Sequence, residues 1–359
     1  MSVFISQLVP RNSESSNKGI SQAAMNFCHN YIIAVNPNQV YALSLISEKN
    51  KKHFIFDNPN VNFIQCRFFP HVGIIRFANA FIENLKIVID IIKSKERKIW
   101  FYNITAHNFI SFLLLKLFRK ECFIILADFE PRLTFNKFSK FLVNISDGII
   151  SFSANVHDLF PKHSNIKILP GIINKDINWE VKSHQFERSI ALFSGSLNDY
   201  AGIELALLTF SKMPEITLII TGSGKQTPLV ESYAKTYKNI NYLGHIEYEE
   251  YIQILNQIDI VLSLRNPTIE GNFYNFPSKI LEYFINRKIV ISTMRHNELP
   301  ELSYVYCDYD ELELISTIQQ VKHMDENKIL SMQELGQDYV KNKLSYKVWK
   351  STVQSLESD

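Results

Sequence analysis

Apolar runs and amphipathic segments alternate along the chain in two successive series. In residues 1–175, short runs rich in β-branched and aromatic residues predict strands at Val3–Val9, Val40–Ile46, Val61–Ile64, Ile99–Tyr102, Phe123–Leu126, Gly148–Phe152 and Ile166–Leu169. Apolar residues at helical spacing between them predict helices at Ile20–His29, Ile74–Lys93, Phe109–Arg119 and Asn136–Asn144. This alternation indicates βαβ units and a parallel sheet.

The same alternation begins again in the second half of the chain. Strands are expected at Ile190–Phe193, Ile216–Thr221, Ile240–Leu243, Ile260–Leu264, Ile289–Ser292 and Val305–Cys307. The helices expected between them are Gly202–Ser211, Pro228–Lys238, Tyr248–Gln257, Ser278–Asn286 and Glu311–Val321. The sequence therefore predicts an α/β protein with two Rossmann-like parallel-sheet domains, which its length of 359 residues also favours.

A polar segment gives the boundary between the two series. We expect a first domain over residues 1–175, a linker over 176–188, a second domain over 189–340 and a C-terminal helix over 341–359. Residues 1–175 hold 21 basic and 11 acidic residues, a net charge of +10, whereas residues 176–359 hold 17 and 25, a net charge of −8. Oppositely charged halves fit two domains that face each other across a cleft, and chance drift of surface charge is the alternative.

The segment from Asn275 to Tyr283 carries the clearest chemistry. It lies between two predicted strands, and Pro277 suits the first turn of a helix. Ser278 and Lys279 would then lie at the helix N-terminus, where free N–H groups and a lysine attract phosphate. Glu282, one turn later, could accept hydrogen bonds from sugar hydroxyls. The pattern predicts a nucleotide-sugar site.

Several protein classes are disfavoured by composition. The four cysteines are scattered, so we expect reduced core thiols rather than a disulfide or zinc framework. No apolar run reaches the roughly 18 residues of a transmembrane helix, and the N-terminus lacks the pattern of a signal peptide. The sequence thus predicts a cytoplasmic protein. Its many Phe and Tyr residues are expected in the core, and no nucleic-acid partner is expected.

Basic amphipathic segments in the first half suggest an anionic partner. The helix expected at Phe109–Arg119 is strongly apolar with a basic end, and the one at Asn136–Asn144 combines lysines with phenylalanines. Such helices can lie on an anionic membrane, on the inner face in this case, or can simply pack on the sheet. We favour packing for the first helix and the membrane for the second.

The order of these motifs resembles that of GT-B glycosyltransferases, and most closely glycosyltransferase family four in the form common among bacterial surface-polysaccharide enzymes. The resemblance covers nearly the whole chain and is strongest from Ala127 to Thr293. It implies that the C-terminal helix packs back on the first domain. It also implies transfer of a sugar from a UDP- or GDP-sugar, with retention of configuration and with no metal or other cofactor.

The resemblance implies specific donor-binding positions. Gly19 opens the first helix near the donor phosphates, Gly195 and Gly222 end the first two strands of the second domain, and Arg265 follows a later strand. His245 and Ile246 match the segment that contacts the nucleotide base, Ser278 and Lys279 hold the pyrophosphate, and Glu282 binds the ribose. Ser196 and Ala201 stand where relatives commonly carry Arg and Lys, and Tyr274 stands where many carry a first glutamate.

Three residues at strand ends of the first domain match the acceptor side of such enzymes. His107 follows the fourth expected strand, and Asp128 and Glu130 follow the fifth. The resemblance places them near the reacting carbon, and a surface histidine and helix-terminal carboxylates are the alternatives. The Asp308-Tyr309-Asp310 motif looks like a metal-binding DxD, but it opens a helix, so we interpret its aspartates as helix-capping charges.

The function predicted from these features is transfer of a sugar from a nucleotide-diphosphate sugar to a lipid-linked glycan during polysaccharide, O-antigen or capsule biosynthesis. Two alternatives remain. A nucleotide-sugar epimerase could share the fold and act without an acceptor. A binding-only protein would fit the changed residues at Ser196, Ala201 and Tyr274.

Overall fold

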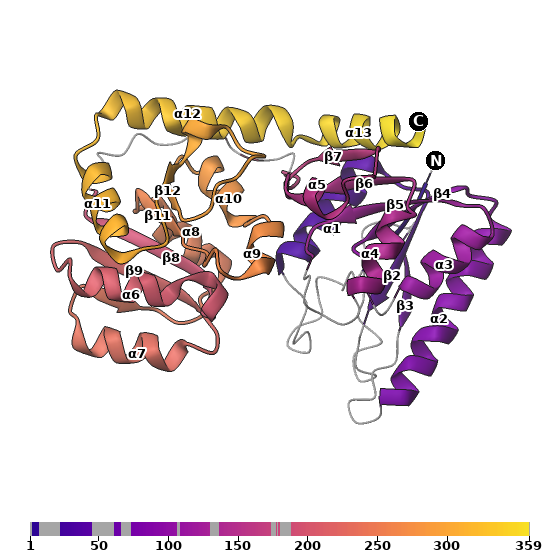
Figure 1. Cartoon of the computed structure of the whole chain (residues 1–359), viewed down its shortest axis with the longest axis horizontal. Coiled ribbons are helices and arrows are strands. Elements are labelled where there is room, and N and C mark those ends of the chain that lie inside the picture. Colours follow the sequence, from indigo (N-terminus) through magenta and orange to yellow (C-terminus); the bar gives the residue numbers. More distant parts are fainter. Residues whose placement is uncertain are drawn as a thin grey trace. The chain divides into compact units, whose positions relative to one another are not determined.

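The computed structural model describes residues 2–6, 22–44, 61–65, 73–105, 108–129, 136–173, 177, 179 and 188–358 (Figure 1). The chain divides into two compact units. The first contains Met1–Lys175 together with Leu344–Asp359, and the second contains Asp176–Lys343. Gly19, His107 and Glu130, three of the predicted site residues, lie outside the described residues.

The first unit is built on a seven-stranded parallel sheet with the strand order β3-β2-β1-β4-β5-β6-β7. Its strands are β1 (Ser2–Ser6), β2 (Gln39–Ser44), β3 (Val61–Gln65), β4 (Lys98–Tyr102), β5 (Glu121–Leu126), β6 (Gly148–Ser151) and β7 (Ile166–Ile168). Its helices are α1 (Gln22–Val35), α2 (Gly73–Lys93), α3 (Phe109–Leu117), α4 (Asn136–Asn144), α5 (Val156–Leu159) and α13 (Tyr346–Ser358).

The C-terminal helix α13 belongs to the first unit because its apolar face packs on α1. Trp349 is fully buried, with its ring centroid 5.2 Å from that of Phe27 and 5.9 Å from that of Tyr31. Its indole N–H donates to the carbonyl of Gly171 at 2.7 Å, so the polar end of this large side chain is also satisfied.

The second unit is built on a six-stranded parallel sheet with the order β10-β9-β8-β11-β12-β13. Its strands are β8 (Ile190–Ser196), β9 (Thr217–Ser223), β10 (Ile240–Tyr242), β11 (Ile260–Ser263), β12 (Ile289–Ser292) and β13 (Val305–Tyr306). Its helices are the 3₁₀ turns η2 (Asp199–Ala201) and η3 (Glu301–Ser303) and α6 (Ile203–Ser211), α7 (Thr227–Thr236), α8 (Tyr248–Asn256), α9 (Glu270–Tyr274), α10 (Lys279–Ile285), α11 (Glu311–Lys322) and α12 (Glu326–Lys343).

The predicted fold class, two parallel α/β sheets of Rossmann type, is confirmed. Both sheets place the first strand of their unit in the middle and extend outward from it in both directions. β11 and β12 are buried along nearly their whole length, as expected for strands covered on both faces. Cys28, Cys122 and Cys307 are buried free thiols, as predicted, and Cys66 lies outside the described residues.

Two local predictions differ from the structure. Residues 270–274, where no helix was predicted, form the short helix α9, in which Asn272 donates through its amide to the carbonyls of Tyr200 (2.8 Å) and Asn266 (2.9 Å). Pro277 was expected within the first helical turn, but α10 begins at Lys279. The chain enters that helix through a tight turn in which the N–H of Ile280 donates to the carbonyl of Pro277 at 3.0 Å.

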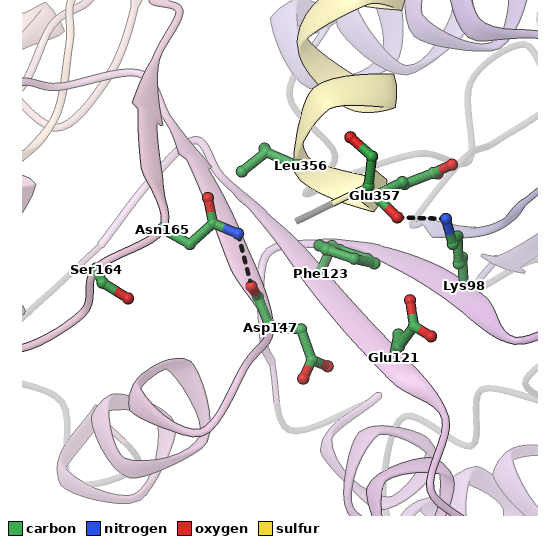
Figure 2. Close-up of a pocket in the computed structure, with 9 residues that line it drawn as sticks. Lys98, Glu121, Phe123, Asp147, Ser164, Asn165, Leu356 and Glu357 are labelled. Atoms are coloured by element: carbon green, nitrogen blue, oxygen red, sulfur yellow. Dashed lines mark hydrogen bonds between the residues drawn. The ribbon is translucent and has the colours of Figure 1, made fainter.

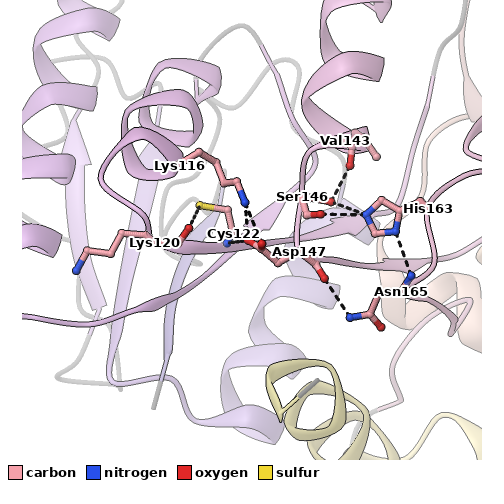
Figure 3. Close-up of polar contacts among 8 residues, drawn as sticks. All are labelled: Lys116, Lys120, Cys122, Val143, Ser146, Asp147, His163 and Asn165. Atoms are coloured by element: carbon pink, nitrogen blue, oxygen red, sulfur yellow. Dashed lines mark hydrogen bonds and ion pairs between the residues drawn. The ribbon is translucent and has the colours of Figure 1, made fainter.

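A network of polar side chains braces the amino-terminal ends of β5, β6 and β7 (Figure 3). Lys116 donates to both carboxylate oxygens of Asp147 at 2.9 Å, and the N–H of Cys122 donates to Oδ2 of the same residue at 2.6 Å. His163 accepts at Nδ1 from the N–H of Asn165 (3.3 Å), so its proton is on Nε2, which donates to the carbonyl of Ser146 at 3.1 Å. The network therefore holds His163 as neutral imidazole.

We expect the protein to lose stability in mild acid because of His163. Burial lowers the pKa of His163 below its ordinary value of 6.5, and the hydrogen bond to Ser146 and the charge of Asp147 oppose this only in part. As the pH falls, the unfolded chain binds this proton before the folded chain does, so the free energy of unfolding decreases below about pH 6.5. Urea unfolding across this range should show a smaller decrease for His163→Gln than for the wild type. Equal decreases would contradict the prediction.

No helix in the described part of the chain is both long and apolar enough to cross a bilayer.

Candidate functional site

The strand order of the second unit marks where a ligand would bind. β8 and β11 are neighbours, and from this pair the chain winds outward to β9 and β10 on one side and to β12 and β13 on the other. Ligands of open α/β sheets bind at the carboxyl ends of the strands, at the point where the winding direction reverses. Here that edge consists of the end of β8, Ser194 to Ser196, and the residues after β11.

Lys279 reaches this edge from α10. Its Nζ donates to Oγ of Ser194 at 2.6 Å, and the same oxygen accepts from the hydroxyl of Thr221 on β9 at 2.8 Å. Burial lowers the pKa of Lys279 below its ordinary value, and the nearby carboxylate of Glu282 partly opposes that shift. A partly desolvated cation is thus held at the end of β8. Its attraction for a bound anion is stronger there than in open water.

Glu282 and Lys279 share a tyrosine that sequence reasoning missed. The hydroxyl of Tyr251 on α8 donates to Oε2 of Glu282 at 2.9 Å, and Nζ of Lys279 lies 4.9 Å from the centroid of its ring. Tyr251 is buried, with 6% of its surface exposed. A second tyrosine of this helix, Tyr248, also lies beside Glu282. Burial and that carboxylate together raise the pKa of Tyr248 to about 12. The carboxylate and the lysine are therefore both positioned by α8.

Glycines let the ends of the second sheet come close together. Gly195 and Gly222 are partners in the β8–β9 register, with φ values of +143° and +119°. A Cβ built on Gly222 would lie 1.8 Å from the carbonyl oxygen of Gly195. A Cβ on Gly195 would meet nothing within 4 Å, so the backbone there faces open space. Such a position allows a ligand to approach the main chain closely.

Other predicted site residues hold the surrounding loops. Oγ of Ser196 accepts from the hydroxyl of Tyr200 at 3.0 Å and from the amide of Asn198. Arg265 donates through Nη1 to the carbonyl of Asn275 at 2.9 Å, so it braces the segment that leads to α10. Ser278 is exposed at the N-cap position of α10, where its side chain makes no capping hydrogen bond.

His245 and Ile246 follow Gly244, at the same edge of the sheet. Gly244 accepts from the N–H of Gly222 through its carbonyl at 2.7 Å, which ties this loop to the end of β9. His245 is exposed and Ile246 is half-buried. The structure therefore brings Gly195, Gly222, His245 and Lys279 to the carboxyl edge of one sheet.

In the first unit, Asp128 is exposed directly after β5. Its N–H and that of Ala127 donate to Oδ1 of Asn103 at 3.3 and 2.8 Å. Asn103 follows β4 with a φ of +52°, so this residue, which was not predicted, shapes the loops at the carboxyl ends of β4 and β5. The other two residues of the predicted acceptor side, His107 and Glu130, lie outside the described residues.

The aspartates of the DxD motif have structural partners, as predicted for Asp310. Asp310 is the N-cap of α11, and its carboxylate accepts from the N–H groups of Leu312 (2.8 Å) and Glu313 (3.2 Å). Asp308 accepts from the hydroxyl of Tyr306 at 2.6 Å. Within the described residues, no three His, Cys, Asp or Glu side chains gather in a way that could hold a metal ion.

An open pocket of about 650 Å³ lies in the first unit, at the edge of the sheet where the strands begin (Figure 2). Lys98 and Glu121 begin β4 and β5 there, so the pocket lies at the amino ends of the strands, away from the edge that binds ligands in such sheets. Its polar groups bond one another: Lys98 donates to the carbonyl of Glu357, and Asn165 donates to that of Asp147 at 3.0 Å. We therefore place the candidate site in the second unit.

Comparison with known proteins bears on both the fold and the site. Residues 175–303 match the family model described as glycosyl transferases group 1. No curated protein matches the chain by sequence. The matched segment spans β8 to η3 and includes every residue that we place at the carboxyl edge of the second sheet.

Solved structures match over nearly the entire chain. A glycosyltransferase from Rickettsia africae aligns with a TM-score of 0.72 and 13% identity, over 99% of this chain and 98% of its own. HepE from Anabaena, in complex with UDP, aligns with a TM-score of 0.71 and 13% identity over 99% of both chains. Sucrose-phosphate synthase from Thermosynechococcus elongatus aligns with a TM-score of 0.74 and 13% identity over 99% and 98%. The fold is thus the GT-B fold, and the match of residues 175–303 to glycosyl transferases group 1 indicates an enzyme of the glycosyltransferase class, EC 2.4.

Proposed function

We propose that the protein transfers a sugar from a nucleotide-diphosphate sugar to a lipid-linked glycan acceptor in polysaccharide biosynthesis. The observation that carries the donor side is the contact between Lys279 and Ser194 at the switch point of the second sheet, 2.6 Å long. It holds a cation beside the open backbone of Gly195, where a pyrophosphate could accept from both the main chain and the lysine. HepE, which shares the fold, has been crystallised with UDP and with UDP and glucose.

In this proposal, the residues of the site have separate roles. Lys279, with the exposed hydroxyl of Ser278, binds the pyrophosphate, and Glu282 binds the ribose. Negative charge builds on the pyrophosphate as it leaves, and a fixed cation at that point stabilises the transition state. Lys279 thus supplies positive charge that a metal ion supplies in other enzymes. His245 and Ile246 lie beside the nucleotide base.

The acceptor side of the proposal rests on the first domain. Asp128 is exposed after β5 and serves the acceptor side in this proposal. The sequence resemblance assigns the same role to His107 and Glu130, which lie outside the described residues. Retention of configuration and membership of glycosyltransferase family four, in its surface-polysaccharide form, follow from the sequence resemblance. The net charge of +10 over residues 1–175 suits a phosphate-bearing lipid carrier.

A thermal-shift screen with UDP, GDP and their sugars tests this function. We expect the diphosphates and one nucleotide sugar to raise the melting temperature, since they bind only the folded protein. If neither base raises it, the binding site is not the one proposed. Incubation of the protein with nucleotide sugars alone tests the epimerase alternative, for which the product would be an epimer. A shift without turnover on any lipid-linked glycan would favour the binding-only alternative.

Tyr251 provides a graded test of the donor site. Tyr251→Phe removes the hydrogen bond to Glu282 but keeps the ring beside Lys279, and we expect it to weaken donor affinity about 5- to 10-fold. Tyr251→Leu also removes the cation–π contact and should weaken affinity further. Isothermal titration with UDP measures both. Tyr233→Phe on α7, where the ring stacks on Tyr237, is the matched control and should bind as the wild type does. Equal affinities for all three variants would contradict these roles.

A further inference from the structure

Helix α2 carries an apolar face that is separate from the face it buries. Asn84, Ile87, Val88 and Ile91 are buried, and the charged residues Glu83, Lys86, Asp90 and Lys93 form another side of the helix. A third side is apolar and exposed: Phe81, Ile82, Ile89 and Ile92 are 47%, 49%, 49% and 36% exposed. Ile82 and Ile89 are seven residues apart, Ile89 and Ile92 three, and Phe81 and Ile92 eleven, so all four lie on one stripe along the helix.

Helix α3 packs against α2 and also presents apolar residues outward. The N–H of Ser111 donates to Oδ1 of Asn84 at 3.1 Å, which joins the two helices through their buried sides. Ser111, Phe112 and Leu115 face inward, whereas Leu117 is 77% exposed and the adjoining Phe118 is 57% exposed. The sequence favoured packing for this helix, and its inner side does pack, but its far end remains uncovered.

Helix α4 continues this surface on the other side of α3. The rings of Phe109 and Phe138 meet at 5.6 Å, and Phe138 stacks on Phe141 at 6.5 Å. Phe141 is itself 53% exposed. Three adjacent helices thus expose large apolar side chains, whereas a water-facing surface normally exposes such residues singly. We call this the α2–α4 surface, defined by its exposed apolar residues Phe81, Ile82, Ile89, Ile92, Leu117, Phe118, Phe138 and Phe141.

Basic residues near the α2–α4 surface favour an anionic binding partner. Residues 109–120 and 136–144 contain five basic residues, Lys116, Arg119, Lys120, Lys137 and Lys140, and no acidic residue. Lys116 is paired with Asp147, but Arg119 and Lys137 are exposed beside the exposed phenylalanines. On α2, Lys86 and Lys93 are accompanied by Glu83 and Asp90, so the basic character of the surface lies on α3 and α4. Exposed apolar side chains beside basic ones on those helices match the boundary between acyl chains and anionic head groups.

We propose that the α2–α4 surface docks the protein on an anionic lipid bilayer. The phenylalanine, leucine and isoleucine side chains enter the acyl boundary, and Arg119, Lys137 and Lys140 contact the lipid phosphates. The inference extends the proposed function, since a bilayer is where a lipid-linked acceptor resides. It does not depend on the donor site, so each can fail without the other.

Co-sedimentation with lipid vesicles tests the proposal directly. The full-length protein should bind vesicles of phosphatidylcholine that contain phosphatidylglycerol, and should bind vesicles of phosphatidylcholine alone much more weakly. High salt should weaken the binding, because it screens the basic residues. Binding that is absent, or that is equal for both vesicle types, would overturn the proposal. UDP binding measured on the same samples shows separately whether the donor site is intact.

Variants of exposed residues identify the surface without disturbing the core. Arg119→Glu and Lys137→Glu should each lower the vesicle partition coefficient by about fivefold or more. Leu117→Ser with Phe141→Ser should lower it by about tenfold. The controls are Lys235→Glu and Leu302→Ser, at exposed positions of the second unit, which should bind as the wild type does. If the first set changes dimerisation in light scattering but not vesicle binding, the surface is an interface between two copies and the proposal is wrong.

Discussion

Replacing Lys279 by alanine is expected to lower kcat/KM for sugar transfer by about 10²- to 10³-fold, the loss typical when one fixed donor to a developing oxyanion is removed. The reason is the position of Nζ, 2.6 Å from Oγ of Ser194 at the switch point of the second sheet. Ser196 and Ala201, where relatives commonly carry cations, are neutral in this chain. In the proposed function, the donor pyrophosphate would therefore depend on Lys279 more than it does in the enzymes that the sequence resembles.

The substitution of Lys279 should weaken binding of the donor and leave binding of the acceptor unchanged. We expect UDP affinity to decrease strongly in Lys279→Ala, while the KM for the acceptor changes little. Lys279→Arg keeps the charge and should recover part of the donor affinity, although its planar group cannot repeat the single contact of an ammonium. Lys235→Ala, on the exposed side of α7, is the matched control. An unchanged UDP affinity in Lys279→Ala would refute the assignment of the site.

The elements around this site were predictable because each has a local pattern. The strand predicted at 260–264, the helix predicted at 278–286 and the strand predicted at 289–292 correspond to β11, α10 and β12. Asp310 was predictable as a helix cap for the same reason, since a capping carboxylate bonds N–H groups only two and three residues ahead. Periodicity and caps depend on neighbours within one turn of the chain, so one sequence suffices to find them.

The contacts that build the site could not be predicted in this way. Lys279 meets Ser194 across 85 residues of sequence, and Tyr251 meets Glu282 across 31. Neither pair has a spacing that belongs to one helix or strand. The strand order sets these contacts by bringing the end of β8 beside β11, and the order of strands in a sheet has no local signature.

Arg265 has a structural role that the sequence did not predict. A cation after β11 fits a phosphate, and the sequence supports nothing more specific. In the structure, its guanidinium donates to the carbonyl of Asn275 and its own carbonyl accepts from Thr293 at 2.7 Å. It thus links the turn before α10 to the end of β12. Its effect on a bound pyrophosphate would come largely through the position of α10, and therefore through Lys279.

The other large effect is expected at Gly222, which keeps the ends of β8 and β9 in contact. In Gly222→Ala, the new methyl group would lie 1.8 Å from the carbonyl oxygen of Gly195, and a φ of +119° is strained for any L residue. Backbone strain alone costs about 1–3 kcal/mol, and the collision with main-chain atoms adds to it. We therefore expect a loss of more than about 3 kcal/mol in the free energy of unfolding of the second unit.

Gly244 offers a matched comparison for this prediction. It also has a positive φ, +73°, but a Cβ there would meet nothing within 4 Å. Gly244→Ala should therefore cost only the strain of the left-handed conformation, about 1–2 kcal/mol. Urea unfolding measures both variants, and UDP titration at low temperature measures what remains of the site. Relief of the collision requires Gly195 to move away from Gly222, so UDP binding should be weakened in Gly222→Ala far more than in Gly244→Ala. Equal losses of stability in the two variants would mean that the close approach of β8 and β9 does not determine the shape of the site.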